Sequence, residues 1–504
     1  MDIPSLFMIP SAVSSGKVHS VFPNSTDADF DFNRDSDATR VNSEGLIERV
    51  GYYSADKITN GDFSTDSDWV KDTGWSISGG KLNFNGTLAN NARQAVSGYN
   101  TTSDYEVTFD LTIESGGAYI MLGYNALTTR TTSGTYTQQG KFTDSGAFNG
   151  FLRIFSTGTS VFSVDNVSIK EVTGNRARLN YEIEGGLVNT KPSLLLEPQS
   201  TNLLTYSENF LSSLWTVIPS YTKNAVVTKV NSKNPYGTYE SYQYKNVNQG
   251  EAQSQLGALV SASIGATYTS SIYIRRVKGT GTITFRNINN GTNDITSQVT
   301  SEWKRFTTTA TAAGSVARVY INLGTEGDII EVFGAQLEQQ SYATSYIPTN
   351  GSTQTRAAET CNGAGTSSIL PSEEGILYIE TSVIGLTSTL ESISISDGTY
   401  NNAILFRYFD TSDNQIQYVV RVGSSIVAAI NFTLSDALAF NKIALKYKAN
   451  DFALWANGTQ VGTDTSGAMP SGLSTLQLDR GDGNSDFYGK IRDIRVYNTK
   501  EMTD

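Results

Sequence analysis

Hydrophobic and polar residues alternate with a period of two along most of the chain. In residues 105–113 every second side chain is apolar, and the side chains between them are Glu, Thr and Asp. Residues 416–422 and 443–447 alternate in the same way. Because successive side chains of a strand point to opposite faces, the pattern predicts strands that bury one face and expose the other.

Short polar segments rich in Gly, Asn and Ser separate these strands. One of them contains the pair Asn457-Gly458, whose residue types tolerate the positive φ angles of a tight hairpin turn. The pattern contains no amphipathic helix longer than two turns. The sequence therefore predicts an all-β chain built from multiple antiparallel β-sandwich domains of the jelly-roll kind.

A weak internal repeat divides the middle of the chain. The first copy runs from Phe63 to Ile169, and the second runs from Phe210 to Leu337. In each copy a tryptophan follows the opening phenylalanine closely, and a Gly-Thr turn precedes the last strand. Each copy has the length of one sandwich domain.

Composition fits this fold class and limits the chemistry. The chain has 504 residues, enough for about three domains, and 11% of them are aromatic while 17% are charged. It has one histidine, His19, and one cysteine, Cys361, which disfavours Ser-His-Asp triads, His-based zinc sites and internal disulfides. The sequence also lacks a P-loop, a dinucleotide fingerprint and the paired carboxylates of concanavalin-like glycosidases. We expect that the protein is not an enzyme.

Charge and hydropathy narrow the range of partners. The formal net charge is −12 at pH 7, which disfavours nucleic acid and anionic membrane surfaces as partners. No segment approaches the ~20 apolar residues of a membrane-spanning helix, so we expect no membrane insertion. The N-terminal segment carries Asp2 where a signal peptide would carry basic residues. We therefore expect a protein made in a cytoplasm without a signal peptide.

The ends of the two repeats resemble those of known carbohydrate-binding domains. The opening Asn-Gly-Asp-Phe of residues 60–63 and the closing Val-Asp-Asn-Val-Ser-Ile of residues 164–169 are similar to carbohydrate-binding modules of families 4 and 9, which are β-jelly rolls. This resemblance implies jelly rolls over residues 57–172 and 201–357. Residues 358–504 resemble the concanavalin A-like, or laminin G-like, sandwich, because of their hairpin at residues 442–461 and their closing strand.

Other segments resemble the start of bacteriophage virion fibre proteins: residues 16–23, 31–47, 192–204 and 334–349. In many such proteins the Ala-Thr-Arg-Val-Asn and Leu-Leu-Leu-Glu-Pro segments lie close together, whereas here the first repeat separates them. We therefore expect residues 57–172 to be inserted into an N-terminal virion-attachment unit. That unit would comprise residues 1–56 and resume at residues 173–200.

The resemblance implies a structural component of a bacteriophage virion. Such a head or tail fibre, or spike, would display its lectin-like domains to glycans of the host surface or the environment. Its partners would be other virion proteins through the N-terminal region, further copies of itself in a homodimer or homotrimer, and bacterial surface polysaccharide. The alternatives are a secreted or surface glycan-binding accessory protein of a carbohydrate-degrading system, and a purely architectural spacer without ligand.

The first residues offer two interpretations. An apolar segment near the N-terminus has no evident sheet partner in the sequence and comprises Leu6, Phe7, Met8, Ile9 and Val13. An exposed apolar segment would suit a docking arm for another virion protein. An edge strand packed onto the chain's own first domain is the alternative.

Sugar binding by a β-sandwich uses aromatic rings that stack on the C–H faces of a pyranose. The candidate residues are Trp75, Tyr119, Tyr236, Tyr239 and Trp455. Trp75, Tyr236 and Tyr239 are flanked by Gly or Pro, which predicts loop positions. Ordinary core packing is the alternative for each of the five, and an interface role is a further alternative for the tyrosines.

Related jelly rolls bind a structural calcium ion where the first and last strands meet. The resemblance places Asn60, Asp62 and Asp165 there, and their oxygen atoms are the ligand type that calcium prefers. The alternative is a pair of hydrogen-bonded turns. We expect no other cofactor.

Overall fold

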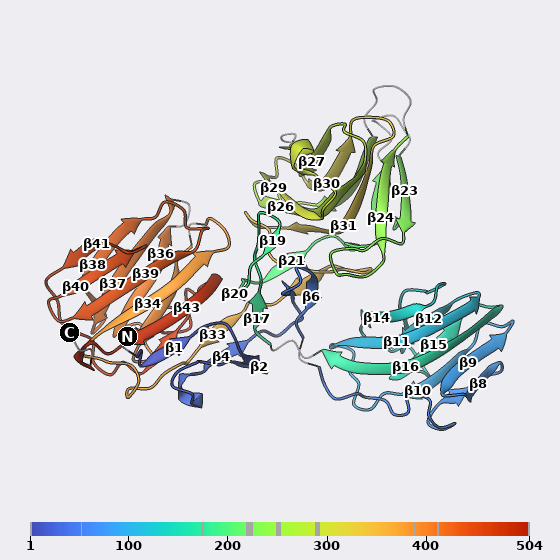
Figure 1. The fold of residues 1–504 in the computed structure, drawn as a ribbon, viewed down its shortest axis with the longest axis horizontal. Helices are drawn as coiled ribbons and strands as arrows, with labels where there is room; N and C mark the ends of the chain where they lie inside the picture. Colours follow the sequence, from blue (N-terminus) through green and yellow to red (C-terminus); the bar gives the residue numbers. More distant parts are fainter. Residues whose placement is uncertain are drawn as a thin grey trace. The chain divides into compact units, whose positions relative to one another are not determined.

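The computed structural model describes residues 3–51, 53–172, 176–217, 225–247, 254–287, 293–387, 389–410 and 413–501 (Figure 1). Within these residues the regular structure consists of antiparallel strands and short 3-10 turns, namely η1 (Thr26–Ala28), η2 (Thr296–Gln298) and η4 (Thr499–Glu501). The predicted all-β class is confirmed. No helix within the described ranges is long and apolar enough to cross a membrane.

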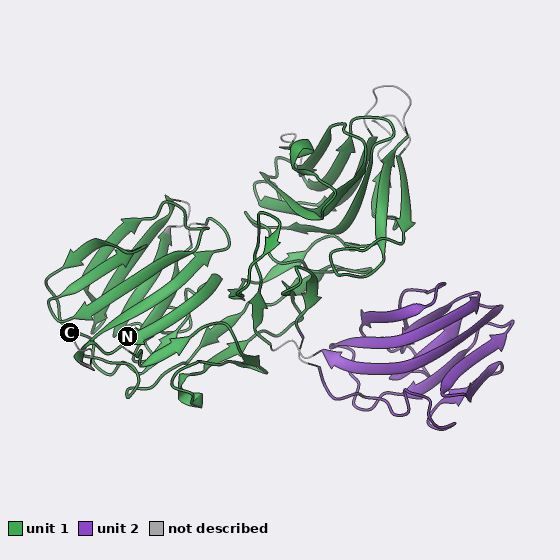
Figure 2. Cartoon of the chain, viewed as in Figure 1, with its two compact units in different colours: residues 1–50, 175–504 green, residues 51–174 purple. Residues whose placement is uncertain are grey.

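The chain forms two compact units (Figure 2). The inserted unit comprises residues 51–174, and the main unit comprises residues 1–50 together with 175–504. The predicted inserted jelly roll, residues 57–172, lies within the first of these. The strand order of each unit is given separately below.

The inserted unit is one sandwich, which we call the first sandwich. One sheet has the order β13-β12-β15-β10-β7 and the other the order β14-β11-β16-β9-β8. Their apolar inner faces form one core. The strands are β7 (Val70–Lys71), β8 (Trp75–Ser78), β9 (Lys81–Gly86), β10 (Asn91–Ala95), β11 (Asp104–Ser115), β12 (Ala118–Leu122), β13 (Asn125–Ala126), β14 (Gly134–Gly140), β15 (Phe151–Ser156) and β16 (Ser160–Val172).

The second sandwich, in the main unit, repeats this plan strand by strand. Its sheets have the orders β28-β27-β30-β25-β22 and β29-β26-β31-β24-β23, so that β22 to β31 take the places of β7 to β16. The strands are β22 (Trp215–Val217), β23 (Ala225–Val230), β24 (Ser241–Asn246), β25 (Ser254–Ser261), β26 (Thr267–Lys278), β27 (Ile283–Asn287), β28 (Asn293–Asp294), β29 (Lys304–Thr311), β30 (Val316–Leu323) and β31 (Ile329–Glu338).

The paired tryptophans of the repeat have the same role in both sandwiches. Trp69 packs on Phe63 and Trp215 packs on Phe210, with ring centroids 5.3 and 4.5 Å apart. Each indole N–H donates to a backbone carbonyl of the opening segment. The sequence repeat therefore corresponds to a repeat of strand order and of core packing.

The third sandwich pairs an eight-stranded with a five-stranded sheet. The first has the order β17-β20-β43-β34-β39-β40-β41, with β1 also paired to β43, and the second has the order β38-β37-β36-β35-β42. The strands are β1 (Leu6–Met8), β17 (Arg178–Asn180), β20 (Ser193–Leu196), β34 (Glu374–Val383), β35 (Glu391–Ser396), β36 (Ala403–Asp410), β37 (Gln415–Val422), β38 (Ser425–Thr433), β39 (Asn441–Lys448), β40 (Phe452–Ala456), β41 (Thr459–Asp464), β42 (Thr475–Gln477) and β43 (Gly489–Tyr497).

The N-terminal strand β1 is an edge strand of the third sandwich. Leu6 and Met8 are fully buried in its core, and their strand pairs with β43 from Ile494 to Val496. The docking-arm interpretation is therefore wrong for these two residues, because their side chains already have a core to fill. The alternative of an edge strand holds, although the sheet belongs to the last domain and not to the first.

The remaining strands of the main unit form small sheets, from segments that lie before and after the second sandwich in the sequence. They are β2 (Val13–Ser14), β3 (Lys17–Val18), β4 (Phe30–Asn33) and β33 (Thr360–Asn362) in one sheet, and the pairs β5 (Thr39–Val41) with β6 (Ile47–Arg49), β18 (Ile183–Glu184) with β19 (Leu187–Val188), and β21 (Ser200–Asn202) with β32 (Gln354–Arg356).

A buried ion cluster joins these small sheets. It consists of Arg34, Arg178, Arg356, Glu197 and Glu359, each at most 4% exposed. Glu359 pairs with Arg34 at 2.6 Å and also with Arg178, while Glu197 pairs with Arg178 at 2.7 Å and with Arg356 at 2.9 Å. Burial alone would raise the pKa of Glu359, but Arg178 and Arg34 outweigh it and lower that pKa.

The ion cluster brings together the segments that resemble fibre proteins. Arg34 belongs to residues 31–47, and Glu197 is the glutamate of Leu-Leu-Leu-Glu-Pro. Arg178 resumes the chain after the insertion and donates to the Thr39 carbonyl at 3.0 Å. The two halves of the interrupted chain therefore meet through this hydrogen bond and through Glu359, which pairs with Arg34 of the first half and Arg178 of the second.

Candidate functional site

The two outer faces of the first sandwich differ in chemistry. The sheet that contains β11 and β16 exposes short polar and charged side chains such as Thr108, Asp110 and Ser163. The sheet that contains β12, β15 and β10 turns rings and guanidinium groups outward, most of them partly or fully buried. We call this second surface the aromatic face, and it comprises Asn91, Arg93, Tyr119, Met121, Phe151, Arg153 and Phe155.

Strand register places these residues in rows across the sheet. Tyr119 lies opposite Phe155, which lies opposite Asn91, and the next row joins Met121, Arg153 and Arg93. The alternate residues point inward, where Ile120, Leu152 and Ile154 are buried in the core. The pleat of β15 therefore turns Arg153 and Phe155 outward together.

Tyr119 and Phe155 form a stacked pair on this face. Their ring centroids are 5.1 Å apart and their planes differ by 13°. Both side chains are half-buried, so part of each ring remains open to solvent. Such a pair presents a rigid apolar surface of the kind that packs against a flat ring.

The guanidinium group of Arg153 packs against three aromatic rings. Arg153 is 4% exposed, and its guanidinium carbon lies 4.6 Å from the ring centroid of Phe148, 5.0 Å from that of Phe155 and 5.1 Å from that of Tyr124. Its Nε donates to the Gly123 carbonyl at 3.1 Å. Burial lowers the pKa of Arg153. In the described part of the chain no carboxylate forms an ion pair with it, so its positive charge is held mainly by rings and one carbonyl.

Three polar side chains lie beside the stacked pair: Asp72, Asn91 and Arg93. Asp72 accepts from Arg93 and from the Asn91 amide, both at 2.8 Å. The Asn91 Oδ1 atom is buried and has no hydrogen-bond partner among the described residues. Because this atom is covered, the polar groups here that a ligand hydroxyl group can reach are the partly exposed side chains of Arg93 and Asp72.

The corresponding face of the second sandwich lacks this arrangement. There Gln255 donates to Asn322 at 2.8 Å, and Asn322 donates to Thr284 at 3.1 Å, across β25, β30 and β27. The outward ring in these strands is that of Tyr320. The same strand order therefore does not require an aromatic face, and the face of the first sandwich reflects its own sequence.

Two of the predicted sugar-binding residues pack against apolar clusters, Trp75 as a buried residue and Tyr236 as a partly buried one. Trp75 is 7% exposed in β8 and packs on Phe84 and Phe162, with centroids 4.8 and 5.4 Å away. Tyr236 packs on Phe333 at 5.5 Å, and its hydroxyl group is buried. The prediction of an exposed loop position is wrong for Trp75, because its ring fills an apolar site in the core. Tyr236 is partly buried in a turn, and a ligand role for it stays a prediction.

Tyr119, Tyr239 and Trp455 keep accessible rings. Tyr119 belongs to the aromatic face, and Tyr239 is 67% exposed in the second sandwich. Trp455 is half-buried on the outer face of the eight-stranded sheet, in a row with Ala444 and Tyr378. Two strand spacings, roughly 10 Å, separate Tyr378 from Trp455, and the small Ala444 lies between them. A ligand role for these residues stays a prediction.

Asn60, Asp62 and Asp165 use their oxygen atoms within turns. Asn60 Oδ1 accepts from the Thr65 amide at 3.2 Å, Asp62 Oδ1 accepts from the Ser64 hydroxyl at 3.1 Å, and Asp165 Oδ1 accepts from the next amide at 2.7 Å. No group of three His, Cys, Asp or Glu residues within the described ranges is arranged to hold a metal. These residues fit a calcium ion poorly, and its binding stays a prediction.

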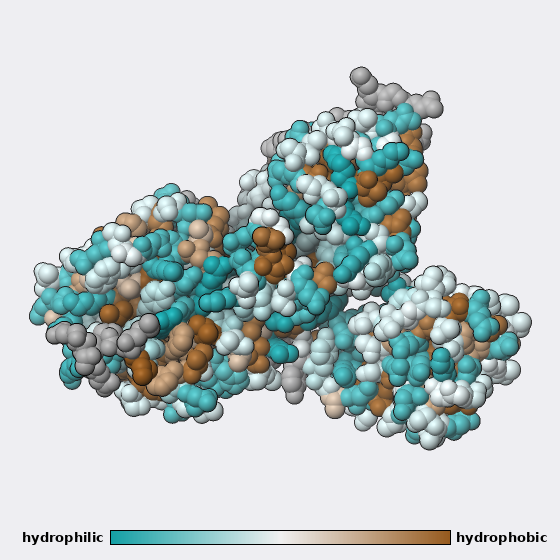
Figure 3. Space-filling view, in the orientation of Figure 1, coloured by the Kyte–Doolittle hydropathy of each residue, from teal (hydrophilic) through white to brown (hydrophobic). Residues whose placement is uncertain are grey.

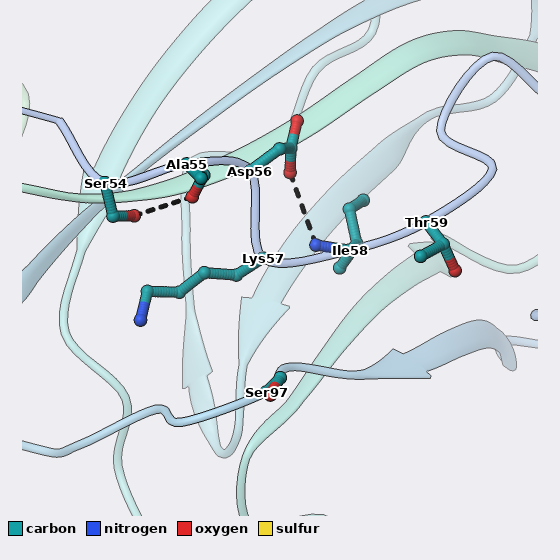
Figure 4. A pocket seen from close by; sticks show the side chains of 7 residues that line it. All are labelled: Ser54, Ala55, Asp56, Lys57, Ile58, Thr59 and Ser97. Carbon is teal, nitrogen blue, oxygen red and sulfur yellow. Dashed lines mark hydrogen bonds between the residues drawn. The ribbon is translucent and has the colours of Figure 1, made fainter.

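The first sandwich also has a surface pocket of about 370 Å³, which Figure 4 shows from close by. It is lined by Ser54, Ala55, Asp56, Lys57, Ile58, Thr59 and Ser97. Asp56 accepts from the Ile58 amide, and Lys57 pairs with Glu171 at 2.8 Å. The polar groups of the pocket are thus satisfied locally, and no aromatic ring lines it.

Apolar residues on the visible face of the molecule lie in small separate patches among polar ones (Figure 3). Surface hydropathy alone therefore does not select a site. The aromatic face stands out through the combination of a stacked ring pair, a buried guanidinium group and the partly exposed pair of Arg93 and Asp72. We take it as the candidate functional site.

Comparisons with known proteins leave the family open. No family model matches the chain, and no curated protein matches it. Solved structures with related folds include a CBM40 module of a Ruminococcus gnavus IT-sialidase bound to α2,3-sialyllactose, at 17% identity and a TM-score of 0.23 over 27% of this chain and 86% of that one.

Two other solved structures are similar over different shares of the chain. The tandem CBM22 domains of Paenibacillus barcinonensis Xyn10C match at 13% identity and a TM-score of 0.21, over 61% of this chain and 98% of that one. The enzymatically active domain of tailspike protein 4 of bacteriophage CBA120 matches at 14% identity and a TM-score of 0.22, over 27% and 21%. At these scores the likeness carries no conclusion about function.

Proposed function

We propose that the protein binds carbohydrate through the aromatic face of the first sandwich. The observation that carries this proposal is the partly exposed, stacked pair of Tyr119 and Phe155 on the same face as the partly exposed Arg93, which pairs with Asp72. A pyranose has an apolar C–H face and a rim of hydroxyl groups. The ring pair offers a surface for the apolar face, and Arg93 and Asp72 offer donors and acceptors for the hydroxyl groups.

The proposed biological setting is a bacteriophage fibre or spike. Its support is the resemblance of residues 16–23, 31–47 and 192–204 to fibre proteins, together with the ion cluster that unites the last two of these segments. In this setting the N-terminal region docks to other virion proteins, the chain forms a homodimer or homotrimer, and the sandwiches face bacterial surface polysaccharide. The protein has no enzymatic activity of its own in this proposal.

Mass spectrometry and immunogold labelling of purified phage particles test the setting. We expect the protein in the particles in a fixed copy number, with antibodies against residues 51–174 labelling an appendage. Absence of the protein from purified particles would overturn the virion assignment. Glycan binding without presence in particles would instead favour the accessory protein of a carbohydrate-degrading system.

A further inference from the structure

A cluster of three arginines surrounds one tyrosine on the outer face of the five-stranded sheet of the third sandwich. The guanidinium carbons of Arg421, Arg480 and Arg407 lie 3.9, 4.7 and 5.3 Å from the ring centroid of Tyr400. Arg421 and Arg480 are partly exposed, and Arg407 is 6% exposed. We call these four residues the arginine cluster.

The positive charge of the arginine cluster is only partly balanced. Arg480 forms a two-pronged pair with Asp482, at 2.8 and 3.0 Å. Arg421 donates to the carbonyl oxygens of Tyr400 and Ser424. Arg407 donates to the Tyr400 hydroxyl group and, at 3.4 Å, to a side-chain amide oxygen. Among the residues that the structure describes, no carboxylate pairs with Arg421 or Arg407.

Nearby carboxylates are engaged elsewhere. Asp397 accepts from Thr399 and Asn402, and Asp479 accepts from Asn362 at 2.9 Å and from the Gly481 amide. Burial raises the pKa of Asp479. Of the three guanidinium groups in the arginine cluster, only that of Arg480 forms an ion pair with a carboxylate among the described residues.

The floor beneath Tyr400 is apolar and fixed. Ala403, Leu405 and Val419 are fully buried although they point to the outer side of their sheet, and Tyr400 packs against them. This packing fixes the position of the Tyr400 ring. The ring in turn contacts the three guanidinium groups, which repel one another. Positive charges gathered around one ring are unfavourable unless an anion compensates them.

We propose that the arginine cluster binds an anionic group, a carboxylate or a phosphate, carried by an acidic polysaccharide. Planar guanidinium groups bind both anions through paired N–H donors, and stacking on Tyr400 orients them in advance. The proposal rests on the proposed function only in taking the carrier to be a polysaccharide. The cluster lies in the third sandwich, so it forms a second site that is chemically distinct from the aromatic face.

Binding of the full-length chain to immobilised polygalacturonate, a polymer of glycerol phosphate and neutral dextran tests this proposal. We expect binding to at least one of the two polyanions, weakened by salt, and little binding to dextran. Arg421→Gln should reduce the affinity for that polyanion about tenfold or more, since a charge-assisted bond is worth ~1.5–3 kcal/mol. The polyanion that binds identifies the anion as carboxylate or phosphate.

Arg492→Gln is the matched control. Arg492 also lies over a ring, with its guanidinium carbon 3.5 Å from the Phe440 centroid, but it belongs to the opposite sheet. It should leave polyanion binding unchanged. Equal binding by wild type and Arg421→Gln, or no binding of wild type to either polyanion, would overturn the proposal.

The same experiment separates this proposal from the proposed function. Phe155→Ala should leave polyanion binding by the arginine cluster in place, because Phe155 belongs to the inserted unit. If polyanion binding depends on Phe155 and not on Arg421, the arginine cluster has only a structural role and the aromatic face binds the polymer. Thermal unfolding of Arg421→Gln at the wild-type temperature would exclude a folding defect as the cause of lost binding.

Discussion

Replacement of Glu359 by glutamine tests the physical role of the ion cluster. Glu359 is fully buried, pairs with Arg34 at 2.6 Å, and also pairs with Arg178. Glutamine preserves the shape of the side chain and removes its charge. Arg178 retains Glu197, but Arg34 loses the carboxylate that its guanidinium group contacts.

The expected loss of stability is large. Removal of one partner from a buried ion pair costs about 3–5 kcal/mol, because the remaining charge stays buried and poorly compensated. The loss should concern the main unit alone, since all five residues of the ion cluster belong to it. The effect should also depend on pH. The folded pKa of Glu359 is lowered, so its contribution to stability is present above the pKa of the unfolded chain and fades as the pH falls through the folded pKa.

Pulse proteolysis along a urea gradient measures this loss for each unit separately. The inserted unit serves as an internal reference, and its midpoint should not move. Glu373→Gln is the control, because its carboxylate pairs with Lys500 at an exposed position and should leave both midpoints unchanged. A loss below about 1 kcal/mol in the main unit, or an equal loss in the inserted unit, would refute the reasoning.

Two further predictions concern buried side chains. Burial raises the pKa of Glu391 to about 8, so between pH 4.5 and 8 this group is protonated when folded and ionised when unfolded. Wild type should therefore lose stability relative to Glu391→Gln by on the order of 1 kcal/mol per pH unit across this window, and parallel pH profiles of urea unfolding would contradict that. Trp75→Ala should destabilise the inserted unit by about 3–5 kcal/mol, because it leaves a cavity beside Phe84 and Phe162. A fully stable Trp75→Ala protein in the same urea assay would instead favour an exposed indole.

The sequence was sufficient for the fold class and for the repeat. Period-two alternation predicts strands wherever one sheet face is buried, and the paired aromatic residues near Phe63 and Phe210 indicate two copies of one sandwich. The alternation does not show which strand an isolated short strand will pair with. The contact of β1 with β43 joins residues almost 500 positions apart, and nothing local in Leu6–Met8 specifies it.

The candidate site was only partly predictable. Tyr119 was identified as an aromatic residue in the first sandwich, but Phe155, Arg153 and Asn91 were not. The sequence Phe-Leu-Arg-Ile-Phe of residues 151–155 is apolar on both faces, which is typical of a fully buried strand. Its one signal was the arginine in the middle, since a charged residue inside such a strand marks the face that is not core. For Trp75 the error is the opposite one: the neighbouring glycines predict an exposed loop, whereas the ring is buried in the core.

The fibre-like segments acquire a physical explanation from the structure. Arg34 and Glu197 of these segments lie at the ion cluster, where they help to hold the main unit together across the insertion. Similarity to fibre proteins at these positions is therefore explained by the folding of the main unit, without any contact with another protein. The proposed contact with other virion proteins would use exposed residues such as Ile3, Val21 and Phe22.

Glycan binding by variants of the aromatic face tests the central claim most directly. The full-length chain is applied to an array of bacterial surface polysaccharides, and the glycan that binds is titrated against wild type, Phe155→Ala and Tyr320→Ala. Tyr320 is the matched control, because it is the outward ring on the corresponding sheet of the second sandwich. We expect Phe155→Ala to lose binding at least tenfold with an unchanged fold, while Tyr320→Ala binds like wild type. Undiminished binding by Phe155→Ala, or no binding of wild type to any glycan, would contradict the account.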